Sequence, residues 1–471
     1  MTKTRVAMAV LAVLLGVLVS VVSAPFAQSP PQSPLRDPMR ARDPGPRGGA
    51  DAAGGPLAGL TGPQLALFEA GQTDFREEEG VGDGLGPRFN MNSCGGCHAQ
   101  GGLGGSSPVV NPQVAVATAF GARNQVPFFA KADGPVREAR FKYKADGSRD
   151  GGVHALFVVS GRVDSTGNVS GCTIRQEDFV AQSRAGNVIF RIPTPVFGAG
   201  LIEQISDGTI VANQAANGPR KGSLGIRGRP HRVPLNGTTN VNGNDGTIAR
   251  FGWKAQNKSL LLFSGEAYNV EMGISNELFQ TERDETAGCQ FAATPNDVTN
   301  PAAASLAESM SAIERFAHFM RFLAAPTPSA NTPGGAGSIT NGRALFQTVG
   351  CALCHTPTLQ TGNAAIAALR NKPVNLYSDL LLHNMGAGLA DDILQVQAGP
   401  DEFRTAPLWG LGQRIFFLHD GRTSDLLEAI QAHAGPGNGR YGPSEANGVV
   451  GAYNRLSEQQ KQDVINFLRS L

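Results

Sequence analysis

Apolar residues recur at three- and four-residue spacing in two segments that lie far apart in the chain. Residues 312–323 read Ala-Ile-Glu-Arg-Phe-Ala-His-Phe-Met-Arg-Phe-Leu, and residues 462–471 read Gln-Asp-Val-Ile-Asn-Phe-Leu-Arg-Ser-Leu. This spacing gathers the apolar side chains on one face, so each segment is predicted to form an amphipathic helix. Pro326 ends the first helix, and the Gly-rich run 334–337 that follows is predicted to be an interdomain linker.

Each of these helices closes a half of the chain that opens in a similar way. Residues 63–71 read Pro-Gln-Leu-Ala-Leu-Phe-Glu-Ala-Gly, and residues 341–350 read Asn-Gly-Arg-Ala-Leu-Phe-Gln-Thr-Val-Gly. Both are predicted to be short amphipathic helices that lead toward a Cys-x-x-Cys-His motif, at 94–98 and at 351–355. A helix–motif–helix unit therefore occurs twice.

The two units predict unequal domains, at 57–328 and at 338–471. Residues 105–300 form an insertion in the first domain that is too long to be a plain connection. Two short β-like runs and an Asn/Gly-rich loop stand within it, at 154–160, 187–192 and 236–246. We interpret the insertion as an elaboration folded over the first motif, where a substrate pocket could be built.

The N-terminus is typical of a secretion signal. Lys3 and Arg5 precede an uncharged apolar run at 6–22, and small residues follow, so a signal peptide at 1–27 is predicted. An uncleaved membrane anchor is the alternative, because the apolar run is long. Residues 28–56 are rich in Pro, Arg and Gly and are predicted to be a flexible leader. The expected location is the periplasm, with no stable membrane span once the signal is cleaved.

Composition narrows the class of protein. The chain has 471 residues, with 60 Gly and 30 Pro, which indicates a loop-rich fold. Lys and Arg total 40 and Asp and Glu total 39, so the charge balance argues against a nucleic-acid partner. Of the six cysteines, only Cys172 and Cys289 lie outside the two motifs. In an exported protein these two are predicted to form a disulfide, with two buried free thiols as the alternative.

The two Cys-x-x-Cys-His motifs carry the clearest chemistry. Two thiols at this spacing can add to the two vinyl groups of one haem, while the adjacent histidine reaches the iron. The expected cofactors are therefore two covalently bound c-type haems, because paired zinc or thioredoxin-like sites explain neither histidine. The attaching cysteines and the proximal iron ligands are Cys94, Cys97 and His98 in the first motif and Cys351, Cys354 and His355 in the second. The predicted fold is mainly α, with two cytochrome c-like haem domains, the first enlarged by a loop-rich insertion with short strands.

Several further motifs resemble those of known di-haem proteins. Residues 377–379, 383–386, 403–412 and 417–430 resemble segments of bacterial di-haem cytochrome c peroxidases. Residues 88–98, 250–256 and 272–274 are similar to the related bacterial di-haem oxidoreductase family. The resemblance covers about 60–471 and implies an oxidoreductase of the peroxidase kind.

The resemblance also implies how the second haem is held. In such peroxidases the distal ligand, usually Met, lies fourteen residues after the His of a His-Asp-Gly motif, and counting from His419 gives His433. An iron held by two histidines should have a lower potential than one held by His and Met. The alternative is Met385 as the ligand, with His433 on a helix surface. His419 is expected at the haem propionates or the domain interface. Residues 414–416 replace the family's calcium-binding Thr-x-Pro, so calcium is doubtful.

The first haem is expected to differ. Val114 stands where the peroxidases often place a displaceable histidine, so the iron of the His98 haem is predicted to be open or weakly ligated and reactive. Glu203, after the Pro-containing loop 193–197, is the candidate for moving a proton between peroxide oxygens, with a structural salt bridge as the alternative. Arg191 is a weaker candidate for stabilising developing charge. Trp253 is the candidate electron relay between the haems, with a core aromatic role as the alternative.

Three functions remain open on these grounds. In the first, a small redox donor (a cytochrome, a cupredoxin or a quinol-linked protein) reduces the C-terminal haem, and the N-terminal haem reduces peroxide. In the second, the open haem binds O₂ and oxidises an organic substrate. In the third, the protein is a pure electron carrier with two six-coordinate irons, and His154 or His231 is the second ligand of the first haem.

Overall fold

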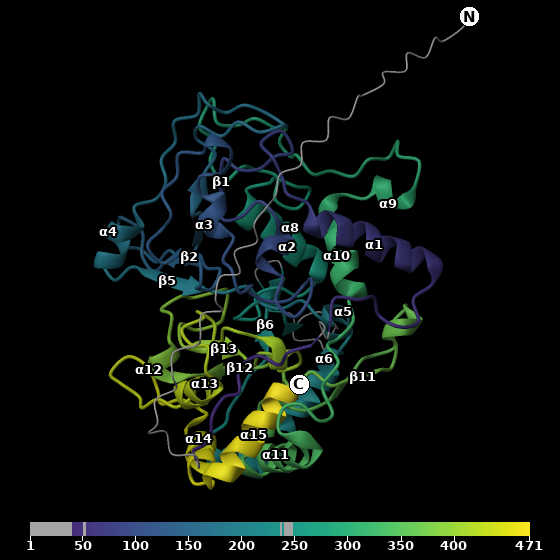
Figure 1. The fold of residues 1–471 in the computed structure, drawn as a ribbon, viewed down its shortest axis with the longest axis vertical. Coiled ribbons are helices and arrows are strands. Elements are labelled where there is room, and N and C mark those ends of the chain that lie inside the picture. Colours follow the sequence, from purple (N-terminus) through teal and green to yellow (C-terminus); the bar gives the residue numbers. More distant parts are fainter. Residues whose placement is uncertain (1–39, 50–52, 236–237, 240–247) are drawn as a thin grey trace, which may run out of the picture. The chain divides into compact units, whose positions relative to one another are not determined.

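The computed structural model describes residues 40–49, 53–235, 238–239 and 248–471. The predicted signal at 1–27 and most of the loop at 236–246 lie outside the described residues. The described chain is mainly helical with short strands (Figure 1). None of its helices has both the length and the apolar character needed to cross a membrane.

The helices are α1 Gly62–Arg76, α2 Cys94–Cys97, α3 Gln113–Val116, α4 Phe179–Arg184, α5 Ala199–Glu203, α6 Asp207–Ala215, α7 Gly218–Leu224, α8 Leu260–Met272, α9 Leu306–Ser309, α10 Ala312–Phe322, α11 Gly335–Val349, α12 Gly386–Leu389, α13 Leu426–Ala432, α14 Asn447–Asn454 and α15 Glu458–Ser470. Short 3₁₀ turns are η1 Ala119–Gly121, η2 Cys351–Leu353, η3 Ala367–Leu369 and η4 Leu411–Gln413. The strands are β1 Arg88–Phe89, β2 Glu138–Phe141, β3 Val153–His154, β4 Phe157–Val158, β5 Val188–Arg191, β6 His231–Arg232, β7 Pro234–Leu235, β8 Thr238–Thr239, β9 Ile248–Ala249, β10 Leu359–Gln360, β11 Pro373–Val374, β12 Leu382–Asn384 and β13 Glu402–Arg404.

Two helix pairs repeat the same packing, α1 against α10 and α11 against α15. Each pair meets at a glycine. A Cβ atom on Gly71 would lie 2.1 Å from the carbonyl oxygen of Arg315, and one on Gly342 would lie 1.9 Å from that of Asp463. No larger residue fits at either crossing, so the internal repeat predicted from the sequence is confirmed as a repeated helix–helix contact.

The structure also corrects the register of that repeat. Both segments contain Ala-Leu-Phe, which would match Phe68 with Phe346, but Phe75 is the residue that lies four positions after the crossing glycine, as Phe346 does. The ring of Phe75 is 5.9 Å from that of His98, and the ring of Phe346 is 6.4 Å from that of His355. The reason is that α1 continues to Arg76, beyond the predicted end at residue 71, so the loop before the first motif contains the extra residues.

The predicted closing helices are confirmed as α10 and α15, but the Gly-rich run is not a linker. Gly334 is the left-handed N-cap of α11 (φ 77°), and the helix begins at Gly335. Glycine is a poor helix former, so packing against α15 rather than local propensity explains the helix here.

The predicted β-like runs of the insertion are confirmed as β3, β4 and β5. Strand β2 lies between β3 and β5 in an antiparallel sheet, the largest among the described residues. Strand β4 pairs with β1, which leads into the first motif. The insertion is thus joined to the backbone just before Cys94.

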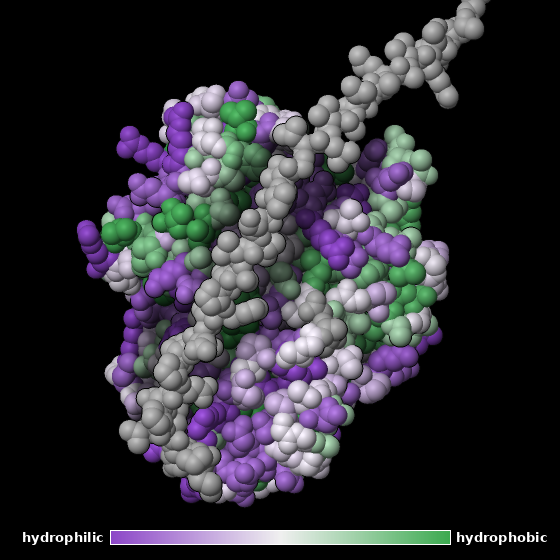
Figure 2. Space-filling model, in the orientation of Figure 1, coloured by the Kyte–Doolittle hydropathy of each residue, from purple (hydrophilic) through white to green (hydrophobic). Residues whose placement is uncertain are grey.

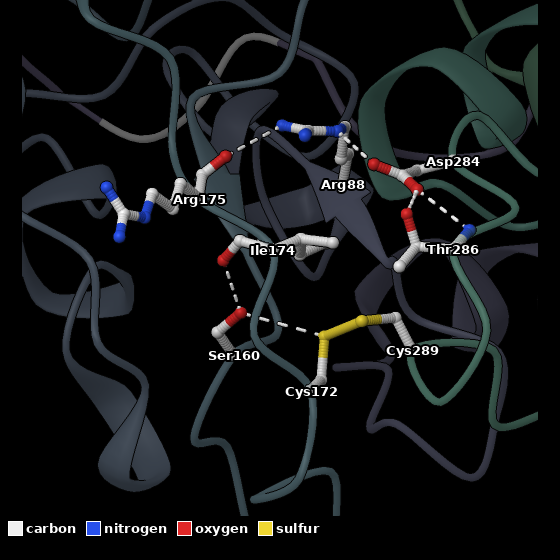
Figure 3. The surroundings of a disulfide bond; sticks show 8 residues. All are labelled: Arg88, Ser160, Cys172, Ile174, Arg175, Asp284, Thr286 and Cys289. Atoms are coloured by element: carbon white, nitrogen blue, oxygen red, sulfur yellow. Dashed lines mark hydrogen bonds and ion pairs between the residues drawn. A yellow bond between two sulfur atoms is a disulfide. The ribbon is translucent and has the colours of Figure 1, made fainter.

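The predicted disulfide Cys172–Cys289 is present and closes a separation of 117 residues (Figure 3). Both cysteines are buried. Ser160 lies beside Cys172 and donates to the carbonyl oxygen of Ile174. An ion pair of 2.7 Å between Arg88 and Asp284 lies in the same region. The bond therefore joins two distant parts of the insertion.

Residues 40–49 of the predicted flexible leader are bound to the C-terminal half. The guanidinium of Arg469 donates to both carboxylate oxygens of Asp43, at 2.7 and 2.6 Å, and the Arg469 side chain is fully buried. The backbone N–H of Arg47 donates to the carbonyl oxygen of Gly412. The buried ion pair offsets the conformational entropy that this segment loses when it is ordered. Residues 40–49 are therefore held in place, whereas the sequence predicted a flexible leader.

The apolar core has two main parts. The larger one contains residues of the N-terminal half together with Leu359, Leu380 and Trp409 from the C-terminal half. The smaller one surrounds Phe346 and Phe467. The two halves therefore share core residues.

On the face drawn in Figure 2, polar and apolar side chains are mixed, with apolar ones gathered over the region of α4 and β2.

Candidate functional site

Each Cys-x-x-Cys-His motif lines a cavity. The lining of both cavities is mainly apolar. The motif residues lining them are Cys94, Cys97 and His98 in the first and Cys351, Cys354 and His355 in the second. Each motif therefore borders an apolar cavity, the place where a cofactor attached to its cysteines would lie.

The two motifs share one local geometry. A single helical turn, α2 or η2, lets the backbone N–H of the histidine donate to the carbonyl oxygen of the first cysteine, at 3.0 Å for His98 and 2.9 Å for His355. The four motif cysteines are free thiols. Burial raises the pKa of Cys94 and Cys351 to about 12, so these thiols are neutral at physiological pH.

The imidazoles of both motifs are oriented as metal ligands. The Nδ1 atom of His98 lies 2.9 Å from the carbonyl oxygen of Gly105, and that of His355 lies 3.0 Å from the carbonyl oxygen of Tyr377. A carbonyl oxygen can only accept, so Nδ1 carries the proton and donates. The Nε2 lone pair is then free for iron, the arrangement typical of metal-bound histidine.

The second cavity contains another histidine in the same state. Nδ1 of His433, the C-cap of α13, donates to the carbonyl oxygen of Ala429 at 2.7 Å. The ring centres of His355 and His433 are 6.4 Å apart. Two opposed imidazoles with metal–nitrogen bonds of roughly 2.0–2.1 Å place their ring centres about 6.4 Å apart. Both histidines and the alternative ligand Met385 line this cavity, and the spacing favours His433.

The first cavity has no second histidine among its described lining residues. His154 stacks on Phe141 and lies 2.9 Å from a carboxylate oxygen of Asp150. His231 is engaged at both ring nitrogens, with the carbonyl oxygen of Lys254 on Nδ1 and the backbone N–H of Gln397 on Nε2. Neither histidine lines the cavity, so neither occupies the position that an electron carrier would require.

Glu203 lies outside both cavities, which corrects its predicted role. Its carboxylate pairs with the guanidinium of Arg321 at 2.8 Å and accepts from the backbone N–H of Leu260, at the start of α8. The salt bridge at a helix end that the sequence left as the alternative is therefore the arrangement found. The Pro-containing loop does reach the cavity, but through Pro193, Thr194 and Val196.

Two other glutamates line the first cavity and share a hydrogen bond, Glu138 on β2 and Glu271 on α8. Loss of hydration and the charge of Glu138 raise the pKa of Glu271 to about 8. Although burial opposes it, the positive charges of Arg140 and Arg191 lower the pKa of Glu138. Asn90 donates to the carboxyl group of Glu271 at 2.8 Å. The pair therefore holds one proton at neutral pH, on Glu271.

Trp253 lines both motif cavities. Its indole N–H donates to the carbonyl oxygen of Ile192 at 2.8 Å, which fixes the ring. The ring centre of His419 lies 6.4 Å away in an edge-on arrangement, and His419 itself stacks on Phe403 at 4.4 Å. The aromatic ring of Trp253 thus separates the two cavities, as an electron relay would.

Residues 137–471 match the family described as "Di-haem oxidoreductase, putative peroxidase". The match covers well over half of the chain. The chain belongs to this di-haem oxidoreductase family. The first motif precedes the matched residues, and the second lies within them.

Comparisons with other proteins add little to this assignment. No curated protein matches the chain. A structure of Kuenenia stuttgartiensis hydrazine synthase is similar at 17% identity over 36% of this chain, with a TM-score of 0.23, and the alignment spans just over half, 56%, of that chain. A MauG-like protein associated with microbial copper homeostasis is similar at 17% identity over 59% of this chain and 90% of that one, with a TM-score of 0.28. Neither score supports a conclusion on function.

Family membership implies two haems, and buried polar groups of this oxidoreductase fit their propionates. Arg404 and Arg414 line the second cavity, and neither forms an ion pair with a carboxylate within the described residues. Burial lowers the pKa of each to about 10, so both remain cationic. In the first cavity, Nε of Arg191 is buried with no partner in the described chain. This donor marks a position where a bound anionic group would complete the site.

One candidate metal cluster exists among the described residues, formed by Cys354, Asp379 and His383. It uses a motif cysteine, so it belongs to the C-terminal haem site. His383 lies between Asp379 at 3.0 Å and Glu445 at 2.8 Å, and although burial opposes it, Asp379 and Cys354 raise its pKa. Both of its ring nitrogens are occupied by carboxylates, so His383 is not placed as an iron ligand.

Sequence reasoning missed the carboxyl pair and the two arginines that form no ion pair within the described residues. Glu271 directly precedes residues 272–274, a segment that is similar to the family. This neighbouring segment could have indicated Glu271 as a site residue. Arg404 and Arg414 stand in or beside the similarly matched segment 403–412. Glu138 carries no local signal, because only the pairing of β2 with β5 and the approach of α8 bring it to the cavity.

Proposed function

We propose that this di-haem oxidoreductase is an exported peroxidase whose C-terminal haem passes electrons to an open N-terminal haem that reduces peroxide. The observation that supports this proposal is the different number of histidines in the two cavities. Two imidazoles face each other across the second cavity, and a single imidazole lies in the first. An iron held on both sides transfers electrons, whereas an iron with a free position can bind a reactant.

The motif residues would hold both haems. Cys94 and Cys97 would form thioether bonds in the first cavity, and Cys351 and Cys354 in the second. When bound, the haems supply the redox change, because their irons accept and release the electrons that peroxide reduction consumes. His433 is proposed as the second ligand in the C-terminal site on the strength of its spacing from His355.

Glu271 is proposed as the proton-transfer group in place of Glu203. Reduction of hydrogen peroxide to two water molecules consumes two electrons and two protons, and the O–O bond breaks more readily when the departing oxygen is protonated. Glu271 holds a proton beside Glu138 and lines the first cavity. Arg140, at 2.6 Å from Glu138, keeps that partner ionised so that it can receive the next proton.

Electrons are proposed to enter at the C-terminal haem and to cross by way of Trp253. The position of the indole between the cavities supports this path. The proposed donor is a small redox partner, either a cytochrome, a cupredoxin or a quinol-linked protein. The N-terminal sequence supports export to the periplasm, where such donors are found.

Spectroscopy of the holoprotein tests this proposal. Electron paramagnetic resonance should show one low-spin and one high-spin haem, and hydrogen peroxide should change only the high-spin component at first. His433→Ala should convert the low-spin centre to high spin while the haem stays attached, whereas Met385→Ala should leave it low-spin. Two inert low-spin haems would contradict the proposal, and a stable oxygenated spectrum after reduction would indicate an O₂-activating oxygenase instead.

A further inference from the structure

Tyr268 connects the N-terminal haem cavity with the protein surface. It lies on α8, one turn before Glu271, and is 5% exposed. Its side chain lines the first haem cavity together with His98, and it also lines a separate outward-facing cavity together with Glu79. No step of the peroxidase reaction proposed above uses this residue.

The phenol is hydrogen-bonded to a buried base. Its hydroxyl donates to Oε1 of Glu79 at 2.7 Å, and Glu79 is 7% exposed. The backbone N–H of Glu79 donates to the carbonyl oxygen of Asn92, two residues before Cys94. The carboxyl group that accepts from Tyr268 is therefore fixed to the haem-attachment loop.

Aromatic rings fill the distance between Tyr268 and the proximal histidine. The ring of Tyr268 lies 5.1 Å from that of Phe316, which lies 6.2 Å from that of Phe75. The ring of Phe75 lies 5.9 Å from that of His98. A continuous contact of π-systems of this kind places the phenol within short range of the haem site.

We propose that Tyr268 and Glu79 form a redox pair through which oxidising equivalents leave the N-terminal haem toward the surface. The inference rests on the proposed peroxidase function. Hydrogen peroxide takes two electrons, one from the C-terminal haem and one from Tyr268. As Tyr268 loses its electron, the phenol O–H bond breaks and the proton passes to the Glu79 carboxylate, which leaves a neutral tyrosyl radical and a protonated carboxyl group.

The cycle closes with an external reductant. A small one-electron donor, such as a phenol, returns an electron to Tyr268, and the proton returns from Glu79 to the phenolate oxygen. The outward cavity that Tyr268 lines gives such a donor access without entry into the haem cavity. The protein would then accept electrons at two places, from its redox partner at the C-terminal haem and from a small donor at Tyr268.

Tyr453 provides a matched control. It is also buried, at 2% exposed, and lines the C-terminal cavity, but its hydroxyl has no hydrogen-bond partner within the described residues. Loss of the phenolic proton has no acceptor there. Tyr453 should therefore not be oxidised, although it lies as close to a haem cavity as Tyr268 does.

Freeze-quench electron paramagnetic resonance after addition of hydrogen peroxide to the two-haem protein tests the pair. The wild-type protein should give a tyrosyl radical that narrows when the protein carries ring-deuterated tyrosine. Tyr268→Phe should lose the signal, Tyr453→Phe should keep it, and Glu79→Gln should form it at least about tenfold more slowly, since a positioned base is lost. Haem content, measured as the pyridine haemochrome, should stay unchanged in all three.

The outcomes separate the two proposals. If peroxide changes the haem spectrum but gives no tyrosine radical, or if the radical persists in Tyr268→Phe, the redox pair is overturned and the peroxidase function stands. If peroxide leaves both haem spectra unchanged, the proposed function falls and the redox pair falls with it.

Discussion

Two glutamates near the first cavity have opposite surroundings, and these decide what each can do. Glu203 is bound to the guanidinium of Arg321 and to the backbone N–H of Leu260, at the start of α8. Glu271 faces the carboxyl group of Glu138 and is shielded from water, which favours its protonated form. Glu271 therefore has a proton to give at neutral pH, and of these two glutamates only Glu271 lines the cavity.

Glu271→Gln should lower the rate of peroxide consumption by about 10²–10⁴-fold, because a positioned proton donor is lost. Haem content should not change, since glutamine preserves the side-chain shape. The matched control is Glu203→Gln, which should keep the rate but lower the stability through the weakened pairing with Arg321. Equal losses of rate in both variants would contradict the assignment of roles.

The rate should also fall as the pH rises through about 8, the pKa of Glu271. Above that pH the carboxyl group has lost the proton that it donates. The pKa of Glu271 in the folded protein lies above the ordinary value of 4.5. The contribution of Glu271 to the free energy of unfolding is therefore fully present below about pH 4.5 and is lost as the pH rises toward 8. A pH–rate profile checks this, and the alkaline fall should be absent in Glu271→Gln.

At the scale of elements, each haem motif is supported by a crossing of two helices. The glycine at each crossing lets the helix backbones approach, and the phenylalanine four residues later then reaches the motif histidine. Phe346 also packs against Phe467 of α15 at 5.4 Å. The position of each proximal histidine thus depends on the helix crossing.

Gly342→Ala should destabilise the protein by about 1–3 kcal/mol, the usual cost of overpacking, because its Cβ would lie 1.9 Å from the carbonyl oxygen of Asp463. Gly337→Ala, on the same helix with nothing within 4 Å, should be neutral or stabilise by up to about 1 kcal/mol. Denaturant unfolding measures both. A Gly342→Ala protein as stable as Gly337→Ala would exclude a tight crossing.

At the scale of the whole molecule, buried contacts join the two halves around the cavities. Asp391 of the C-terminal half pairs with Arg191 at 2.6 Å and with Lys254 at 3.1 Å, and all three are buried. The backbone N–H of Arg404 donates to the carbonyl oxygen of Trp253. These contacts hold the indole in place relative to both cavities.

Trp253→Phe should slow electron transfer between the haems by roughly tenfold, the effect of a barrier about 1.4 kcal/mol higher. Stopped-flow measurement of C-terminal haem oxidation after peroxide addition gives the rate. Trp409→Phe is the control, because Trp409 is buried nearby but lines neither motif cavity. An unchanged rate in Trp253→Phe would exclude the relay role.

The amino-acid sequence by itself determined the haem-attachment motifs, the amphipathic helices and the pairing of the two remaining cysteines, and its resemblance to di-haem peroxidases implied the candidacy of His433. These follow from chemistry within a few residues or from counting. Only the tertiary structure decided that Glu203 is a structural ion pair, that Glu138 and Glu271 meet, and that Trp253 lies between the cavities. Glu138 and Glu271 stand 133 positions apart in the chain. Contacts at such separations depend on how helices and strands pack, which no local pattern specifies.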